Sequence, residues 1–205
     1  MLARRVAVPC LLALLGALAP AAPSLSAQQM TNQSEYPIGF GLAAGLNIPV
    51  GSIGDGASTG WNLQGFVDWT SRTQPFGLRG DISYGVLPGK NFQTVDFNDL
   101  KLFSITGDGV WMIHPTPGSA SRTTPYLLAG VGLYHASQSG DIAGQTVDNG
   151  STNFGINFGG GILYKLTGFS AFGEIRYHNV FSGSDGGSAK YVPIVVGLRF
   201  GGGGR

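Results

Sequence analysis

The sequence predicts an all-β protein that folds into one closed, antiparallel, up-and-down, eight-stranded transmembrane β-barrel. Three observations lead to this fold class. The chain has 35 glycines among 205 residues and only 11% charged residues, whereas average globular proteins have about 7% Gly and about 25% charged residues. Apolar and polar residues alternate with the period of two that a β-strand produces. One of the two alternating faces is apolar, and the set of residues assigned to it includes no charged residue.

The first 27 residues differ from the rest and have the pattern of a secretory signal peptide. Two arginines precede an apolar run, and a small-x-small cleavage pattern ends at Ala27. The only cysteine, Cys10, lies within this segment, so we expect a mature chain without disulfides. The exported domain is therefore predicted at residues 28–205, with the barrel at about residues 36–200.

Each expected strand is bounded by clusters of Gly, Pro, Asn, Asp or Ser. The eight strands are predicted near residues 37–48, 60–70, 76–86, 100–113, 125–135, 152–165, 169–179 and 191–200. The gaps mostly alternate in length: four are long, two are short, and 114–124 is an exception. The long gaps are 49–59, 87–99, 136–151 and 180–190, and the short ones are 71–75 and 166–168. Long loops at one end and short turns at the other are typical of a membrane barrel.

One face of every expected strand carries apolar residues and glycine. In chain order it includes Phe40, Leu42, Leu46, Leu63, Val67, Leu78, Ile82, Phe103, Ile105, Trp111, Leu127, Val131, Leu133, Ile156, Phe158, Ile162, Ile175, Ile194, Val196, Leu198 and Phe200. An Arg or Lys at the bilayer midplane of a barrel costs roughly 2–4 kcal/mol, so lipid would exclude charge from this face. Aromatic residues at the ends of the apolar stripes match two interfacial girdles. We expect these membrane-interface aromatics at Trp61, Trp69, Phe76, Tyr84, Phe154, Tyr164, Phe169 and Tyr177.

The opposite face of the strands is polar and rich in glycine. Eight strands leave an interior just wide enough for side chains to fill, so a water-filled pore does not follow. Glycine is expected to relieve crowding in a small, strongly curved barrel. We predict a buried interior charge network of four acids and three bases, formed by Asp68, Arg79, Asp81, Asp108, Glu174, Arg176 and Arg199.

The charge balance and motifs exclude several classes of function. Lys and Arg total 12 against 11 Asp and Glu, which favours no nucleic-acid partner. The sequence has no His or Cys spacing typical of a metal site. Acidic residues in the longer loops could bind a divalent ion, but solvated loops are the favoured interpretation. We therefore predict no metal, no cofactor and no catalytic residue.

Four segments carry a resemblance to a known family. They are Gly-Leu-Asn-Ile-Pro at 45–49, Pro-Tyr-Leu-Leu-Ala-Gly-Val-Gly-Leu-Tyr at 125–134, Gly-Glu-Ile-Arg-Tyr-His at 173–178 and Tyr-Val-Pro-Ile-Val-Val-Gly-Leu-Arg-Phe at 191–200. With them the chain resembles the outer-membrane protein β-barrel family, the small eight-stranded barrels like the OmpA transmembrane domain and OmpX. The resemblance covers about residues 36–200.

The resemblance implies a location and partners. It places the exported protein in the outer membrane of a Gram-negative-type cell, as a monomer in contact with outer-membrane lipid and lipopolysaccharide. It also implies recognition by the barrel-assembly machinery through a final aromatic residue. Phe200 fits this assembly signal, but residues 201–205 follow it, which departs from the family pattern.

Three functions remain open from the sequence. The favoured one is a non-catalytic barrel with a structural or surface-interaction role through its four longer loops. The second is a lipid-modifying barrel enzyme similar to a lipid A deacylase, using His178, Ser182 and Glu174. In that enzyme the Ser follows the His by two residues, whereas here the spacing is four, and the alternation points His178 inward. The third is a soluble, lipocalin-like binder whose aromatic face, including Trp61, Trp69 and Trp111, surrounds an apolar ligand.

Overall fold

The described part of the chain is one barrel with short additions at one end. The computed structural model describes residues 38–71, 74–92, 95–96, 99–113, 121–142, 145–182 and 187–201. The predicted signal peptide at residues 1–27 lies outside these ranges. The elements are β1 (Ile38–Val50), α1 (Ser52–Gly56), β2 (Gly60–Thr70), β3 (Phe76–Leu87), β4 (Asn91–Phe92), β5 (Val95–Asp96), β6 (Leu100–Met112), β7 (Thr123–Ile142), β8 (Gln145–Lys165), β9 (Phe169–Phe181) and β10 (Ser188–Gly201).

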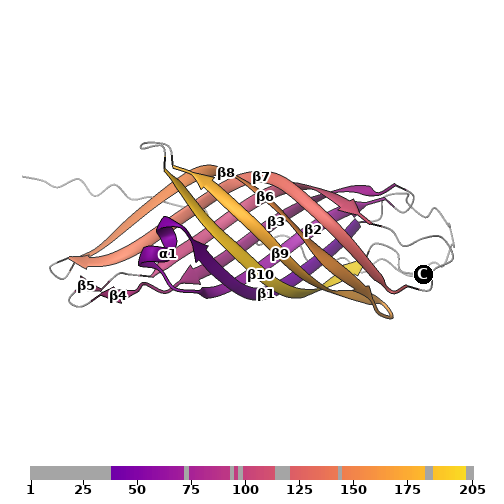
Figure 1. The fold of residues 1–205 in the computed structure, drawn as a ribbon, viewed down its shortest axis with the longest axis horizontal. Helices are drawn as coiled ribbons and strands as arrows, with labels where there is room; N and C mark the ends of the chain where they lie inside the picture. Colours follow the sequence, from indigo (N-terminus) through magenta and orange to yellow (C-terminus); the bar gives the residue numbers. More distant parts are fainter. Residues whose placement is uncertain are drawn as a thin grey trace, which may run out of the picture. The chain divides into compact units, whose positions relative to one another are not determined.

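Eight strands close the barrel in the order β1-β10-β9-β8-β7-β6-β3-β2 (Figure 1). Every neighbouring pair in this order is antiparallel, and β1 closes on β10 with Phe40 opposite Phe200. β4 and β5 form a separate two-stranded sheet. The predicted closed, up-and-down, eight-stranded architecture is therefore confirmed. A closed barrel has no free sheet edge within its wall, so each strand there pairs on both sides.

The two ends of the barrel differ. We call the end where β1, β3, β7 and β9 finish the loop end, and the opposite end, where residues 166–168 join β8 to β9, the turn end. At the loop end α1 packs beside the connection after β3. The backbone N–H of Ser58 donates to the Pro88 carbonyl at 2.7 Å, and Lys90 donates from its N–H to the Gly56 carbonyl at 3.0 Å. The first two connections at the loop end are thus tied together.

The prediction of a long loop at 136–151 is wrong. β7 runs on to Ile142 and β8 begins at Gln145, and their register continues from Ala136↔Ser151 to Ile142↔Gln145. β6 pairs with β7 only as far as Gln138, and β9 pairs with β8 only from Gly155. The β7–β8 hairpin therefore extends past both neighbours at the loop end (Figure 1). The connection expected at 180–190 is also shorter, since β9 ends at Phe181 and β10 begins at Ser188.

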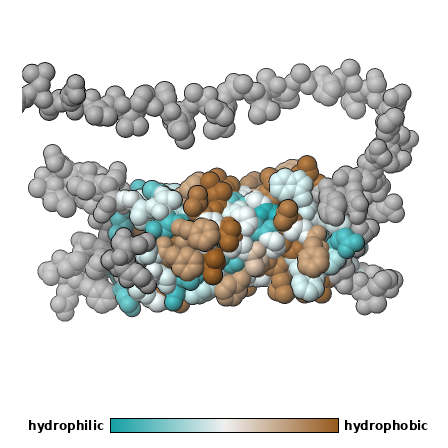
Figure 2. All heavy atoms as spheres, turned by 90° about the horizontal axis from the view of Figure 1, so that it is seen from above, coloured by the Kyte–Doolittle hydropathy of each residue, from teal (hydrophilic) through white to brown (hydrophobic). Residues whose placement is uncertain are grey.

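The outer wall of the barrel is apolar. Large hydrophobic side chains such as Leu42, Leu78 and Val196 are 68%, 66% and 69% exposed, and Figure 2 shows hydrophobic residues along the middle of the visible wall. Trp61, Trp69 and Trp111 are 44%, 42% and 52% exposed. The lipocalin-like alternative required these aromatics to point inward, so it is wrong. No helix among the described residues is long and apolar enough to cross a membrane.

The barrel interior is less polar than the sequence predicted from the polar, glycine-rich face of the strands. A buried apolar cluster fills part of it, made of Ala43, Phe66, Val110, Tyr126, Leu128, Leu163, Phe172 and Val195. These residues share the inward parity of the charged ones, because successive side chains on a strand point to opposite faces. The interior thus combines an apolar layer with polar and charged groups.

The apolar band of the outer wall should not tolerate a charged side chain. Ile105 is 54% exposed on the outer face of β6, so Ile105→Arg places a cation against hydrocarbon. We expect a loss of roughly 2–4 kcal/mol in the free energy of unfolding from lipid vesicles, measured by denaturant titration. Thr59→Arg, at an exposed position between α1 and β2, is the matched control and should change it by less than about 0.5 kcal/mol. Equal stability of the two variants would contradict a lipid-facing wall.

Candidate functional site

All seven charged residues predicted for the interior are buried, with exposed fractions between 3% and 8%. They form two groups instead of one network. Arg79, Asp81, Asp108, Glu174 and Arg176 make a central ion cluster, and Asp68 and Arg199 make a separate pair. The central ion cluster comes from β3, β6 and β9, whose inward positions bring these side chains together across the lumen.

Arg176 is the centre of this cluster. Its guanidinium contacts all three acids: Nε donates to Glu174 at 2.6 Å, one terminal nitrogen to Asp108 at 3.0 Å and the other to Asp81 at 3.1 Å. Arg79 joins two of the same acids from the other side, donating to Glu174 at 2.8 Å and to Asp81 at 2.9 Å. Charge-assisted bonds of this kind are roughly twice as strong as neutral ones.

Neutral side chains complete the cluster. Gln64 donates to Asp81 at 2.6 Å and the Tyr126 hydroxyl donates to Glu174 at 2.6 Å. Asn157 donates to Asp108 at 2.8 Å. Buried charges require such additional donors, because attraction between the ions alone does not offset their desolvation. Six strands, β2, β3, β6, β7, β8 and β9, therefore contribute to one connected polar core.

The apolar layer adjoins this core through Arg79. The Arg79 guanidinium carbon lies 3.5 Å from the centre of the Phe66 ring. Phe66 in turn meets Phe172 edge-on, with ring centroids 5.5 Å apart. A guanidinium over an aromatic face is attracted by the ring quadrupole, the more so when desolvated. The sequence prediction missed these two inward aromatics because it searched the interior for charge.

The second group lies toward the turn end. Arg199 binds Asp68 with two nitrogens, each at 2.6 Å, and also donates to Thr70 at 3.1 Å. Gly39 leaves the room for this pair, since a Cβ there would lie 2.6 Å from both Asp68 Oδ1 and an Arg199 nitrogen. The pair links β2 to β10, which lie on either side of β1.

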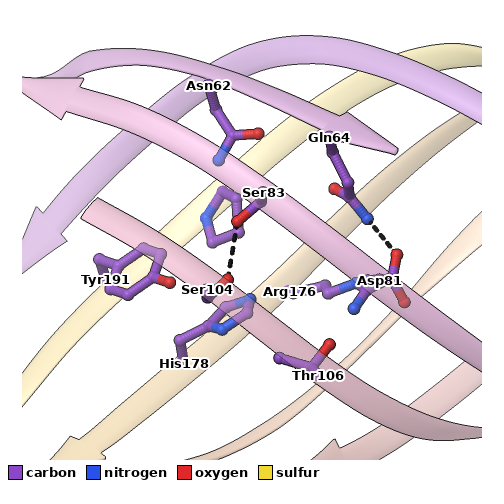
Figure 3. Close-up of a pocket in the computed structure, with 10 residues that line it drawn as sticks. Asn62, Gln64, Asp81, Ser83, Ser104, Thr106, Arg176, His178 and Tyr191 are labelled. Atoms are coloured by element: carbon purple, nitrogen blue, oxygen red, sulfur yellow. Dashed lines mark hydrogen bonds and ion pairs between the residues drawn. The ribbon is translucent and has the colours of Figure 1, made fainter. Parts of the chain in front are cut away.

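The space left inside the barrel is small. One cavity, lined in part by Asn62, Asp81, Ser83 and Ser104, leaves about 10 Å³ for the centre of a water molecule (Figure 3). Asn62 Oδ1 and Asp81 Oδ2 are buried there without a protein hydrogen-bond partner. A second cavity, near Phe66 and Arg199, leaves about 20 Å³, so side chains fill the lumen.

The side chains of the enzyme alternative do not assemble. His178 is 5% exposed and points inward, where its Nδ1 lies 2.9 Å from the Tyr134 hydroxyl. Ser182 is exposed beyond the end of β9, roughly 13 Å along the strand from His178 at the usual rise. Glu174 is bound by two arginines and a tyrosine. In the described structure these three residues form no nucleophile–base–acid chain.

The predicted interface aromatics lie on the outer wall in two groups. At the loop end Trp61 and Tyr84 are 5.6 Å apart between ring centroids. At the turn end Phe76 contacts Trp111 at 5.3 Å and Phe169 contacts Phe200 at 6.0 Å. The remaining predicted residues, Trp69, Phe154, Tyr164 and Tyr177, also have outward parity. Their role at the membrane interface and that of Phe200 in assembly stay predictions.

Three inward tyrosines are further residues that the sequence prediction missed. Tyr126, Tyr134 and Tyr191 are each 4% exposed or less, and Tyr134 and Tyr191 both pack against His178. Strand parity alone would have found them, because Leu127 and Leu133 had already been placed outside. No cluster of metal-binding side chains occurs in the described ranges.

Together, an apolar outer wall, antiparallel closure and a charged, filled lumen define a small transmembrane β-barrel. The chain belongs to the outer membrane protein beta-barrel domain family, whose model matches residues 11–200. It is therefore an outer-membrane protein. Comparison with curated protein sequences finds no match.

Solved structures agree on the fold. Neisserial surface protein A is 18% identical, with a TM-score of 0.57 over 82% of this chain and 97% of that one. Ail, the attachment invasion locus protein of Yersinia pestis, is 17% identical, with a TM-score of 0.51 over 82% and 99%. A major outer membrane protein from Thermus thermophilus is 12% identical, with a TM-score of 0.55 over 80% and 99%. Identities this low show a shared fold alone.

Removing the centre of the cluster should destabilise the barrel. Arg176→Met leaves three buried acids with only Arg79, so we expect a loss of about 3–5 kcal/mol in the free energy of unfolding. Denaturant titration of the protein in lipid vesicles measures this loss. Lys165→Met, at an exposed lysine of the turn end, is the control and should change the value by less than about 0.5 kcal/mol. An unchanged midpoint for Arg176→Met would show that the cluster does not stabilise the fold.

Proposed function

We propose that this protein is a non-catalytic surface-interaction protein that acts through its loop end. In outer-membrane barrels the short turns face the periplasm and the longer loops face outward. By this rule α1, the β4–β5 sheet and the β7–β8 hairpin project from the cell surface. Binding residues are commonly carried on such projections over a rigid scaffold.

The β7–β8 hairpin is the observation that carries this proposal. Residues 145–154 of β8 have no pairing partner on the side away from β7 among the described residues. They offer roughly 30 Å of strand edge at about 3.4 Å per residue. A free edge presents unpaired N–H and C=O groups that can pair with an extended segment of another protein. The surface partner is therefore proposed to be a protein that adds a strand to β8.

The lumen supports a role other than transport. The two cavities described above, of about 10 and 20 Å³, each leave room for about one water, and the central ion cluster lies between opposite walls. The buried position of His178 and the distance to Ser182 likewise favour a non-catalytic barrel. The fold is one that Ail, an attachment invasion locus protein by name, also has.

Shortening the hairpin tests the proposal. Gln138 and Asn149 are opposite each other in the ladder, so replacing residues 139–148 with Asn-Gly keeps the register and removes the projection. We expect cells that display this variant to lose the adherence to protein-coated surfaces that cells displaying the unshortened protein show. Replacing residues 183–186 with Asn-Gly, in the β9–β10 connection, is the matched control and should leave adherence unchanged. Equal adherence of all three proteins would contradict the proposal.

The filled lumen should also block permeation. We expect purified protein in lipid vesicles to leave the vesicles impermeable to small sugars and to give no stepwise conductance in planar bilayers. Vesicles containing a large porin provide the positive control. Steady single-channel conductance from the folded, heat-modifiable form would show that the lumen opens.

A further inference from the structure

Polar side chains gather on the outer wall at the base of the β7–β8 hairpin. Lys101 on β6, His135 on β7 and Thr152 on β8 are all exposed. Lys101 and His135 share the outward parity of Phe103 and Leu133, so they face away from the lumen. Lys101 and His135 lie outside the β8 edge on which the proposed function rests, and Thr152 lies within that edge, near its base.

The ladder places the three side chains on neighbouring strands. His135 is opposite Phe103 on one side and Thr152 on the other. Its Nδ1 lies 2.8 Å from the Thr152 hydroxyl oxygen. Lys101 is opposite Ser137, which makes it the diagonal neighbour of His135, at roughly 7–8 Å. Gly150 leaves the ring uncovered, since a Cβ there would come within 3.0 Å of His135 Cε1.

The group borders the apolar band on the side of the loop end. Phe103 follows Lys101 by two residues toward the turn end, and Phe154 follows Thr152 in the same way. These aromatics are 37% and 51% exposed on the wall. Aromatic side chains mark the boundary between hydrocarbon and headgroups in outer-membrane barrels. Lys101, His135 and Thr152 therefore lie at headgroup level in the leaflet at the loop end.

The chemistry of the group selects an anion. A lysine ammonium has three donors and no acceptor. In the tautomer in which the Thr152 hydroxyl donates to Nδ1, and in the protonated ring, His135 carries a proton on Nε2 as a further donor. Asp99, two residues before Lys101, accepts a bond from the Gly89 N–H at 3.3 Å. We propose that Lys101 and His135 bind a phosphate of the outer-leaflet lipid, namely the phosphate of lipid A.

Native mass spectrometry of the full barrel in detergent micelles, titrated with bisphosphorylated lipid A, tests this site. We expect the wild-type protein to bind, and the double variant Lys101→Gln/His135→Gln to bind about five- to tenfold more weakly, as for the loss of surface charge near a membrane. Lipid A stripped of phosphate should bind the wild type with the same reduced affinity. Lys165→Gln, which removes an exposed lysine from the turn end, should bind like the wild type.

Three outcomes would overturn the assignment. They are wild-type affinity in the double variant, equal binding of phosphate-free lipid A, and displacement of lipid A by millimolar inorganic phosphate, which would assign the site to free phosphate. A heat-modifiable gel shift verifies that each variant is folded. Loss of adherence on shortening the hairpin is measured separately, so failure of one proposal leaves the other intact.

Discussion

The barrel depends on the contact between Arg176 and three buried carboxylates. This guanidinium reaches Asp81, Asp108 and Glu174 from β9, and so connects strands that are not neighbours in the wall. Backbone ladders fix each strand to its two neighbours only. A cluster across the lumen adds constraints on the cross-section, and it does so where the cavities leave little room for water to replace a lost partner. Because a buried ion left alone is costly, the cluster also favours one register over its alternatives.

The strand register also determines which side chains face the membrane lipid. Successive side chains of a strand point to opposite faces, so a slip by one residue would exchange the two sets. On β9 this would turn Glu174 and Arg176 toward lipid and Ile175 into the ion cluster. Two effects oppose this slip. Hydrocarbon excludes the charged side chains, and the ion cluster would lose the three carboxylate contacts of its central guanidinium. The lipid outside the wall and the ion cluster inside it therefore both favour the observed alternation of apolar and polar side chains.

Strand parity explains why the sequence predicted so much of the fold and of the lumen. Charged residues on one face of each strand identified all seven interior ions without any knowledge of pairing. Parity does not say which ions meet, since this depends on strand stagger and side-chain conformation; Asp68 and Arg199 separated from the others for that reason. The extension of β7 and β8 was missed because residues 136–151 are rich in Gly, Ser, Asn and Asp, which have low β-propensity. There, continuation of an established ladder outweighs propensity.

The β7–β8 hairpin is supported differently within the barrel wall and beyond it. Within the wall, β7 and β8 are held by neighbours on both sides and by Tyr126 and Asn157 reaching into the ion cluster. Past the rim they hold only each other, and an isolated two-stranded hairpin is marginally stable in water. The barrel therefore supplies the order that the projection lacks by itself. A phosphate bound at Lys101 and His135 would brace the hairpin at the level where support from β6 ends, and an added strand on β8 would extend that support outward.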